Sequence, residues 1–143
     1  TDQLPHYQLG DLIEIFLHPE AETFYWEFFA TPREKISTIW FPHNHTKPTY
    51  IEGIPMRVAA RCDGTLNDSS DRDRGWSVKV AIPLHVLEPT LKSSWHEIPW
   101  RILIARYNYS RFLAGSPELT MAPQLSVTNF HLLEEYGTLK LIR

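Results

Sequence analysis

The chain has 143 residues, of which 43% are hydrophobic and 22% are charged, and its formal net charge is −3. This length is enough for one domain with its own hydrophobic core, and the net charge gives no electrostatic reason to expect a nucleic-acid partner. Cys62 is the single cysteine, which excludes an internal disulfide and a cysteine-based zinc site. No run of about 18 apolar residues is present, so a membrane span is not predicted.

The first half of the chain predicts three β-strands. Residues 11–17 are predicted as a strand with Glu14 on one face between the apolar Leu12 and Phe16. Residues 24–31 are rich in aromatic side chains on both faces, which is typical of a central strand covered on both sides. A short third strand is predicted over residues 36–41. The polar, proline-containing stretch 42–55 has the composition of a surface loop.

The second half predicts a hairpin followed by two more strands. Residues 57–63 and 76–83 are joined by a polar loop, and the second of these segments alternates strictly between apolar and polar residues. Alternation recurs over residues 100–107, and residues 137–142 supply a last strand. Only short helical pieces are expected, near residues 85–87 and over residues 129–135.

Short alternating strands, connected by loops in a chain with 11 prolines, predict an all-β fold of two antiparallel sheets. We therefore expect a single antiparallel β-sandwich domain over residues 1–143, with little helix.

Four segments in this order resemble the family 9 carbohydrate-binding modules and the wider group of DOMON-like β-sandwich domains. They are DLIEIFLHP, GTLN with the following DRDRGWSVKVAIPL, WRILIARYN, and NFHLLEEYGTLKL. The resemblance implies non-catalytic binding of a terminal sugar or short glycan, by a module of an exported polysaccharide-processing protein that is secreted, periplasmic or on the cell surface. Such modules carry further strands before the segment that resembles DLIEIFL. The chain is thus expected to be a shortened variant or to lack N-terminal strands.

The resemblance also implies an aromatic clamp on the sugar. The corresponding positions here are Tyr7 and Phe130, where the family's sugar-binding members have tryptophan. Sugars present apolar C–H faces, for which aromatic rings are suitable platforms. An alternative for Phe130 is that it anchors the last connection against the sandwich. Trp40 and Trp95 border loops and are the reserve candidates for exposed platforms.

Polar contacts to the sugar hydroxyls are expected from four residues. Glu14 occupies a matching position of the resemblance, and Glu27 stands where the family's sugar binder has a basic residue. Arg106 and Asn108, at the end of WRILIARYN, are expected to complete a polar rim. Because an unpaired buried carboxylate is costly, the alternative for Glu14 is an ion pair with Arg106 or Arg101.

Two groups of residues invite a metal hypothesis. Asp68, Asp71 and Asp73 lie close together in the predicted hairpin loop, which makes calcium possible, although a solvated loop with local Asp–Arg pairing explains them as well. His43 and His45 have a separation compatible with one metal ion, without an evident third ligand.

Three other functional classes remain as alternatives. Related DOMON-like domains bind haem through residues such as methionine and histidine, and this chain contains Met56 and Met121. A structural module that packs on a neighbouring domain without a small ligand is the second alternative. Acid/base catalysis by carboxylates such as Glu14 and Glu27 is the third, but the sequence carries no recognised catalytic motif.

Overall fold

The computed structural model of the chain describes residues 2–44, 46–68 and 70–142. Its nine strands within these ranges are β1 (Leu12–Pro19), β2 (Tyr25–Ala30), β3 (Ile36–Phe41), β4 (Thr49–Tyr50), β5 (Arg57–Asp63), β6 (Gly75–Ala81), β7 (Trp100–Asn108), β8 (Glu118–Ala122) and β9 (Gly137–Leu139). The short 3₁₀ helices are η1 (His6–Gln8), η2 (Leu84–Val86), η3 (Glu88–Thr90) and η4 (Leu133–Glu135).

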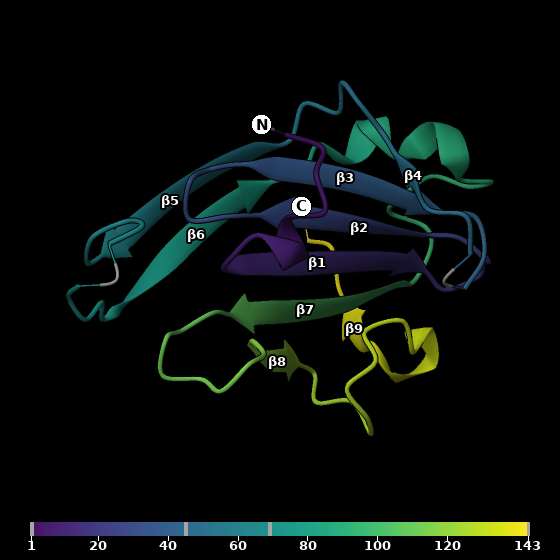
Figure 1. Cartoon of the computed structure of the whole chain (residues 1–143). Coiled ribbons are helices and arrows are strands. Elements are labelled where there is room, and N and C mark those ends of the chain that lie inside the picture. The colour runs from purple at the N-terminus through teal and green to yellow at the C-terminus, as the bar shows by residue number, and fades with distance from the viewer. Residues whose placement is uncertain (1, 45, 69, 143) are drawn as a thin grey trace.

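The strands form two antiparallel sheets (Figure 1). The main sheet has the order β4-β3-β2-β1-β7-β8, and β9 pairs with the start of β7 on the same side as β8. The second sheet consists of the hairpin β5-β6. This architecture confirms the predicted antiparallel β-sandwich with little helix.

The main sheet is buried on both faces at its centre. All six residues of β2 are buried, as the aromatic residues on both of its faces predict. Alternation divides the side chains into two hydrophobic clusters, with Phe16 and Phe29 on one face of the sheet and Leu17 and Phe28 on the other. We call the first face, which also carries Glu14, the acidic face.

The hairpin β5-β6 and the helices η2 and η3 cover the opposite face. Figure 1 shows β5 and β6 on the side of the main sheet away from η1. Trp100, Leu87 and Met56 are buried in this layer. Trp40 and Trp95, the reserve candidates for exposed platforms, are half-buried against the same cluster.

The acidic face is covered by η1 and by the segment 125–136, which follows β8. Leu125, Phe130 and Tyr136 of this segment are buried in the cluster of that face. The Tyr136 hydroxyl donates a hydrogen bond of 2.5 Å to the backbone carbonyl oxygen of Phe130. Ser126 donates from its backbone N–H and its hydroxyl to the Glu135 carboxylate. These bonds fix the segment that lies over the sheet.

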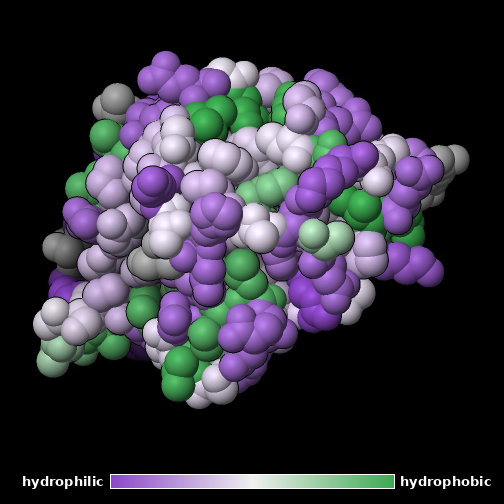
Figure 2. All heavy atoms as spheres, turned by 90° about the vertical axis from the view of Figure 1, so that its right-hand side faces the viewer, coloured by the Kyte–Doolittle hydropathy of each residue, from purple (hydrophilic) through white to green (hydrophobic). Residues whose placement is uncertain are grey.

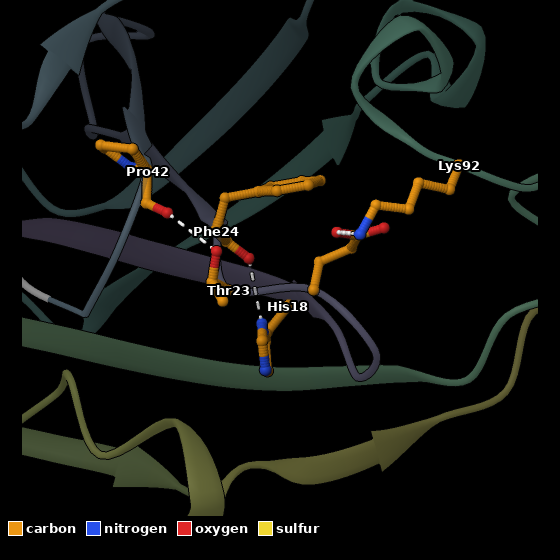
Figure 3. A network of polar contacts seen from close by, with 6 residues as sticks. His18, Thr23, Phe24, Pro42 and Lys92 are labelled. Atoms are coloured by element: carbon orange, nitrogen blue, oxygen red, sulfur yellow. Dashed lines mark hydrogen bonds and ion pairs between the residues drawn. The ribbon is translucent and has the colours of Figure 1, made fainter.

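Polar contacts also fix the turn between β1 and β2 (Figure 3). The His18 Nδ1–H donates to the Phe24 carbonyl oxygen at 3.1 Å, and the Thr23 hydroxyl donates to the Pro42 carbonyl oxygen at 3.2 Å. Lys92 reaches Glu22 of the same turn with an N–O distance of 3.2 Å. The turn is thereby tied to the end of β3 and to the segment that follows η3.

The structure differs from the sequence prediction in its shorter elements. The sequence pattern did not predict β4 or β8. The last strand ends at Leu139 instead of residue 142, and the helical candidate over residues 129–135 forms only the single turn η4. Strands of two or three residues make too few ladder contacts to leave a recognisable alternation in the sequence.

Candidate functional site

A pocket of about 470 Å³ lies on the acidic face, between the main sheet and the segment 128–131. Its lining comes from β1, β2, β3, β4, β7 and β8, from η1, and from that segment. The volume is within the usual range for a small-molecule site, about 300 to 1,000 Å³. Four predicted site residues line it, although they are far apart in the sequence: Tyr7, Glu14, Glu27 and Phe130.

Two glutamic acids form the polar part of the pocket floor. Glu14 on β1 pairs with Phe29 on β2, and Glu27 on β2 pairs with Phe16 on β1, so the two acids are diagonal neighbours on the same face. Only 2% of Glu14 and 5% of Glu27 are exposed. Both side chains are thus held by the central strands of the sheet and reach the surface only through the pocket.

The burial of these acids changes their protonation. Burial raises the pKa of Glu27 from its ordinary value of 4.5 to about 8. Burial, and then the neighbouring Glu27 carboxylate, raise the pKa of Glu14 well above its ordinary value. Among the described residues, no lysine or arginine forms an ion pair with either carboxyl group. The ion pair expected as an alternative for Glu14 is not formed with Arg101 or Arg106.

Aromatic rings form most of the pocket wall. The Tyr7 ring contacts the Phe29 and Tyr107 rings, each at 6.1 Å between centroids, and Phe130 meets Tyr107 edge-on at 5.9 Å. Tyr107 therefore lies between the two residues expected to form the clamp. Burial, then the nearby Glu14, raise the pKa of the Tyr107 phenol, which stays protonated and able to donate a hydrogen bond.

Phe130 lies where both of the roles considered for it would place it. It lines the pocket, yet it is 6% exposed and belongs to the hydrophobic cluster. Replacing such a residue with alanine costs about 3 to 5 kcal/mol. Phe130→Ala would therefore perturb folding, and a more exposed ring makes a better probe of binding.

The pocket rim contains residues that the sequence did not single out. Tyr50 of β4 is the most exposed of the lining rings, at 38%, and Asn129 and His131 come from the covering segment. The Asn129 side-chain oxygen accepts a hydrogen bond from the His131 backbone N–H. Phe29 and Tyr107 share the face of Glu27 and Glu14 by alternation and could have been found from the strand pattern. Tyr50, Asn129 and His131 depend on how two loops pack.

Arg106 and Asn108 lie away from this pocket. On β7, Ala105 pairs with Glu14 and faces the pocket, so Arg106 points to the opposite side of the sheet. Arg106 and Asn108 instead line a larger, polar groove of about 880 Å³ beside the β5-β6 loop. The Asn108 side chain donates to Glu118 at 2.9 Å. The structure thus separates these two residues from the other four.

The aspartates of the β5-β6 loop make local hydrogen bonds. The Asp73 carboxylate accepts from the Thr65 N–H, and the Asp68 carboxylate accepts from the Ser70 N–H. A side chain at Gly64, where φ is +152°, would begin 1.9 Å from the Asp73 carboxylate oxygen. Among the described residues no group of three potential metal ligands comes together. The calcium hypothesis gains no support here.

The remaining hypotheses concern a metal site formed by two histidines and a haem site formed by methionines. His45 lies outside the described residues, so the structure does not test the pair of His43 and His45. Met56 is buried between the main sheet and the hairpin, whereas Met121 packs on the acidic face. The two methionines that prompted the haem alternative are thus on opposite faces of the main sheet.

None of the helices formed by the described residues has the length and apolarity of a membrane span.

Comparisons with known proteins add a likeness of fold. No protein-family model and no curated protein matches the sequence. The chain is similar in structure to a "putative carbohydrate-binding protein" from Bacteroides uniformis, with a TM-score of 0.69 at 14% sequence identity. The match covers 96% of this chain and 63% of the other chain. At this identity the likeness shows a shared β-sandwich fold.

Proposed function

We propose that this chain binds carbohydrate without transforming it, and that the pocket on the acidic face is the binding site. The observation that carries the proposal is that aromatic rings and two acidic groups meet in one small pocket of a sandwich fold. Rings suit the C–H faces of a sugar, and carboxyl and amide groups suit its hydroxyls. The structural likeness to a protein described as carbohydrate-binding supports this reading.

The protonation of the acids favours binding over catalysis. Acid/base cleavage of a glycoside needs one protonated and one ionised carboxyl group. The pKa of Glu27 is raised to about 8 and that of Glu14 is also raised. Burial therefore favours the protonated form of both groups, whereas a nucleophile or general base has to be ionised.

The resemblance to family 9 modules supports two finer parts of the proposal. We expect the ligand to be a terminal sugar or short glycan, held against Tyr7, Tyr107 and Phe130. We also expect the chain to act outside the cell, beside a domain that processes the polysaccharide.

Figure 2 bears on the alternative of a purely structural module. On the face that it shows, apolar residues form small patches between polar ones, without one broad apolar surface. A module whose role is only to pack on a neighbour is expected to carry a large apolar patch.

A glycan-array screen followed by calorimetric titration tests the proposal. Tyr50→Ala removes a half-exposed pocket ring and should weaken binding about tenfold, because losing one stacking ring costs about 1 to 3 kcal/mol by analogy with base stacking. Phe112→Ala is the matched control, since Phe112 is 73% exposed and lines the other groove. Binding to no glycan would refute the function. Loss of affinity in the Phe112 variant alone would move the site to the groove.

A further inference from the structure

The pocket on the acidic face contains two buried carboxyl groups. Glu14 and Glu27 face it from adjacent strands, and no lysine or arginine is among its described lining residues. Two buried carboxyl groups side by side are unfavourable when ionised, because each loses its hydration and repels the other. Such a pair either holds a proton or is balanced by a cation, and the described lining of the pocket includes no lysine or arginine cation.

The pocket wall offers a second feature that favours a cation. Its rings come from three tyrosines and three phenylalanines: Tyr7, Tyr50, Tyr107, Phe29, Phe41 and Phe130. The face of an aromatic ring attracts a cation, most strongly where water is excluded. Rings arranged around buried acids form the kind of environment in which substituted ammonium groups are bound.

We propose that the ligand of this pocket carries a protonated amine, so that the sugar recognised is an amino sugar with a free amino group. The inference rests on the proposed function and specifies its ligand class. Glu14 and Glu27 would accept hydrogen bonds from the ammonium group, and the tyrosine and phenylalanine rings would contact the sugar. A neutral or N-acetylated sugar leaves the acid pair without a counter-charge.

Amine binding by this pocket has a measurable consequence in protons. The free protein holds protons on its acid pair near neutral pH, and a cation that favours the ionised form displaces them. The other described titratable groups lining the pocket are Tyr7, Tyr50, Tyr107 and His131. A ligand with a fixed trimethylammonium group gains no proton itself. Its binding should release protons, which titration in buffers of different ionisation enthalpy detects.

Three matched ligands test the ligand class by calorimetry at neutral pH and physiological ionic strength. They are glucosamine, N-acetylglucosamine and glucose oligosaccharides of equal length and linkage. We expect the amine-bearing oligosaccharide to bind at least about tenfold more tightly than the other two. Equal or tighter binding of a neutral oligosaccharide would overturn the inference and leave the proposed function standing. Binding of none of the three in the same assay, and of no glycan on the array, would overturn both.

A pair of variants separates the pocket from the general negative charge of the protein. Glu27→Gln and the control Glu52→Gln each remove one carboxyl group, and Glu52 is exposed and outside the pocket. Glu27→Gln should lose the preference for the amine, and Glu52→Gln should keep it. Glu14→Gln provides a second pocket variant with the same expected loss. Retention of the preference in both pocket variants would refute the inference.

Discussion

Replacing Glu27 with glutamine should stabilise the protein by an amount that grows with pH. The folded protein holds the Glu27 proton up to a pKa of about 8, whereas the unfolded chain loses it near the ordinary value of 4.5. Stability therefore falls as pH rises through this window and is level above it, because the folded state binds more protons than the unfolded state. At about 1.4 kcal/mol per pH unit, the full window corresponds to about 5 kcal/mol.

This magnitude is the upper limit of the effect, since water entry relieves part of the burial cost. It is comparable with the whole free energy of unfolding of many domains, about 5 to 15 kcal/mol. Glutamine has nearly the same shape and does not titrate. The variant and the parent should therefore have similar stability near pH 4. Their free energies of unfolding should then diverge progressively up to pH 8 or 9, by on the order of several kcal/mol.

Glu14 also contributes to the expected pH dependence of stability. Part of its raised pKa comes from Glu27, so the single variant lowers the Glu14 pKa without restoring it to its ordinary value. The Glu27→Gln variant should still lose some stability as pH rises. The double variant, with both Glu14→Gln and Glu27→Gln, should lose the least. Burial lowers the pKa of His6 and His18, which gives a slope of opposite sign at acid pH. That slope is common to all variants and cancels in their differences.

Urea unfolding monitored by tryptophan fluorescence measures these differences between pH 4 and pH 9. Trp26 and Trp100 are buried and report loss of the core. The control is Glu52→Gln, whose stability should follow the parent at every pH. Parallel curves for the parent and Glu27→Gln across the whole range would refute the reasoning, because they would show that Glu27 has the same pKa in both states.

Three further predictions concern the parts that hold the pocket in place, and each is checked by urea unfolding at neutral pH. Tyr136→Phe removes the hydrogen bond to the Phe130 carbonyl oxygen and should lower the free energy of unfolding by about 1 kcal/mol. Glycan binding should weaken as well. Unchanged stability would show that this bond does not fix the covering segment. Trp100→Ala should cost about 3 to 5 kcal/mol, because the side chain is 2% exposed and its indole N–H donates to the Trp95 carbonyl oxygen; a cost below about 1 kcal/mol would contradict the assignment of this layer as core. Lys92→Ala should change stability by less than about 0.5 kcal/mol, since its ammonium group is exposed beside Glu22, and a larger loss would contradict that.

The hairpin strands β5 and β6 were predictable from the sequence because each has seven residues and alternates strictly in burial. Strands β1 and β7 are long and rich in apolar residues, although their burial has no strict period of two. The short strands β4 and β8 were missed. Glu118–Ala122 alternates in burial, but it is only five residues long and lies between two prolines.

The site was predictable only in part, for a related reason. Strand parity separates Arg106 from Tyr107, but only the register of β1 against β7 shows that Tyr107, and not Arg106, shares the face of Glu14. The positions of Tyr7 and Phe130 beside the acids depend on a turn and on a covering segment without regular structure. No local pattern in the sequence encodes where such segments pack.

The acid pair is the point where the sequence departs from the rules that build the rest of the fold. Glu14 and Glu27 occupy buried positions of central strands, where an apolar residue would stabilise the sheet more. Both line the pocket, and neither forms an ion pair with a described lysine or arginine. Local rules are commonly broken at functional sites, where the cost in stability is balanced by function. This cost is most readily offset by a ligand that carries a positive charge, so the same two residues connect the predicted pH dependence of folding with the predicted choice of sugar.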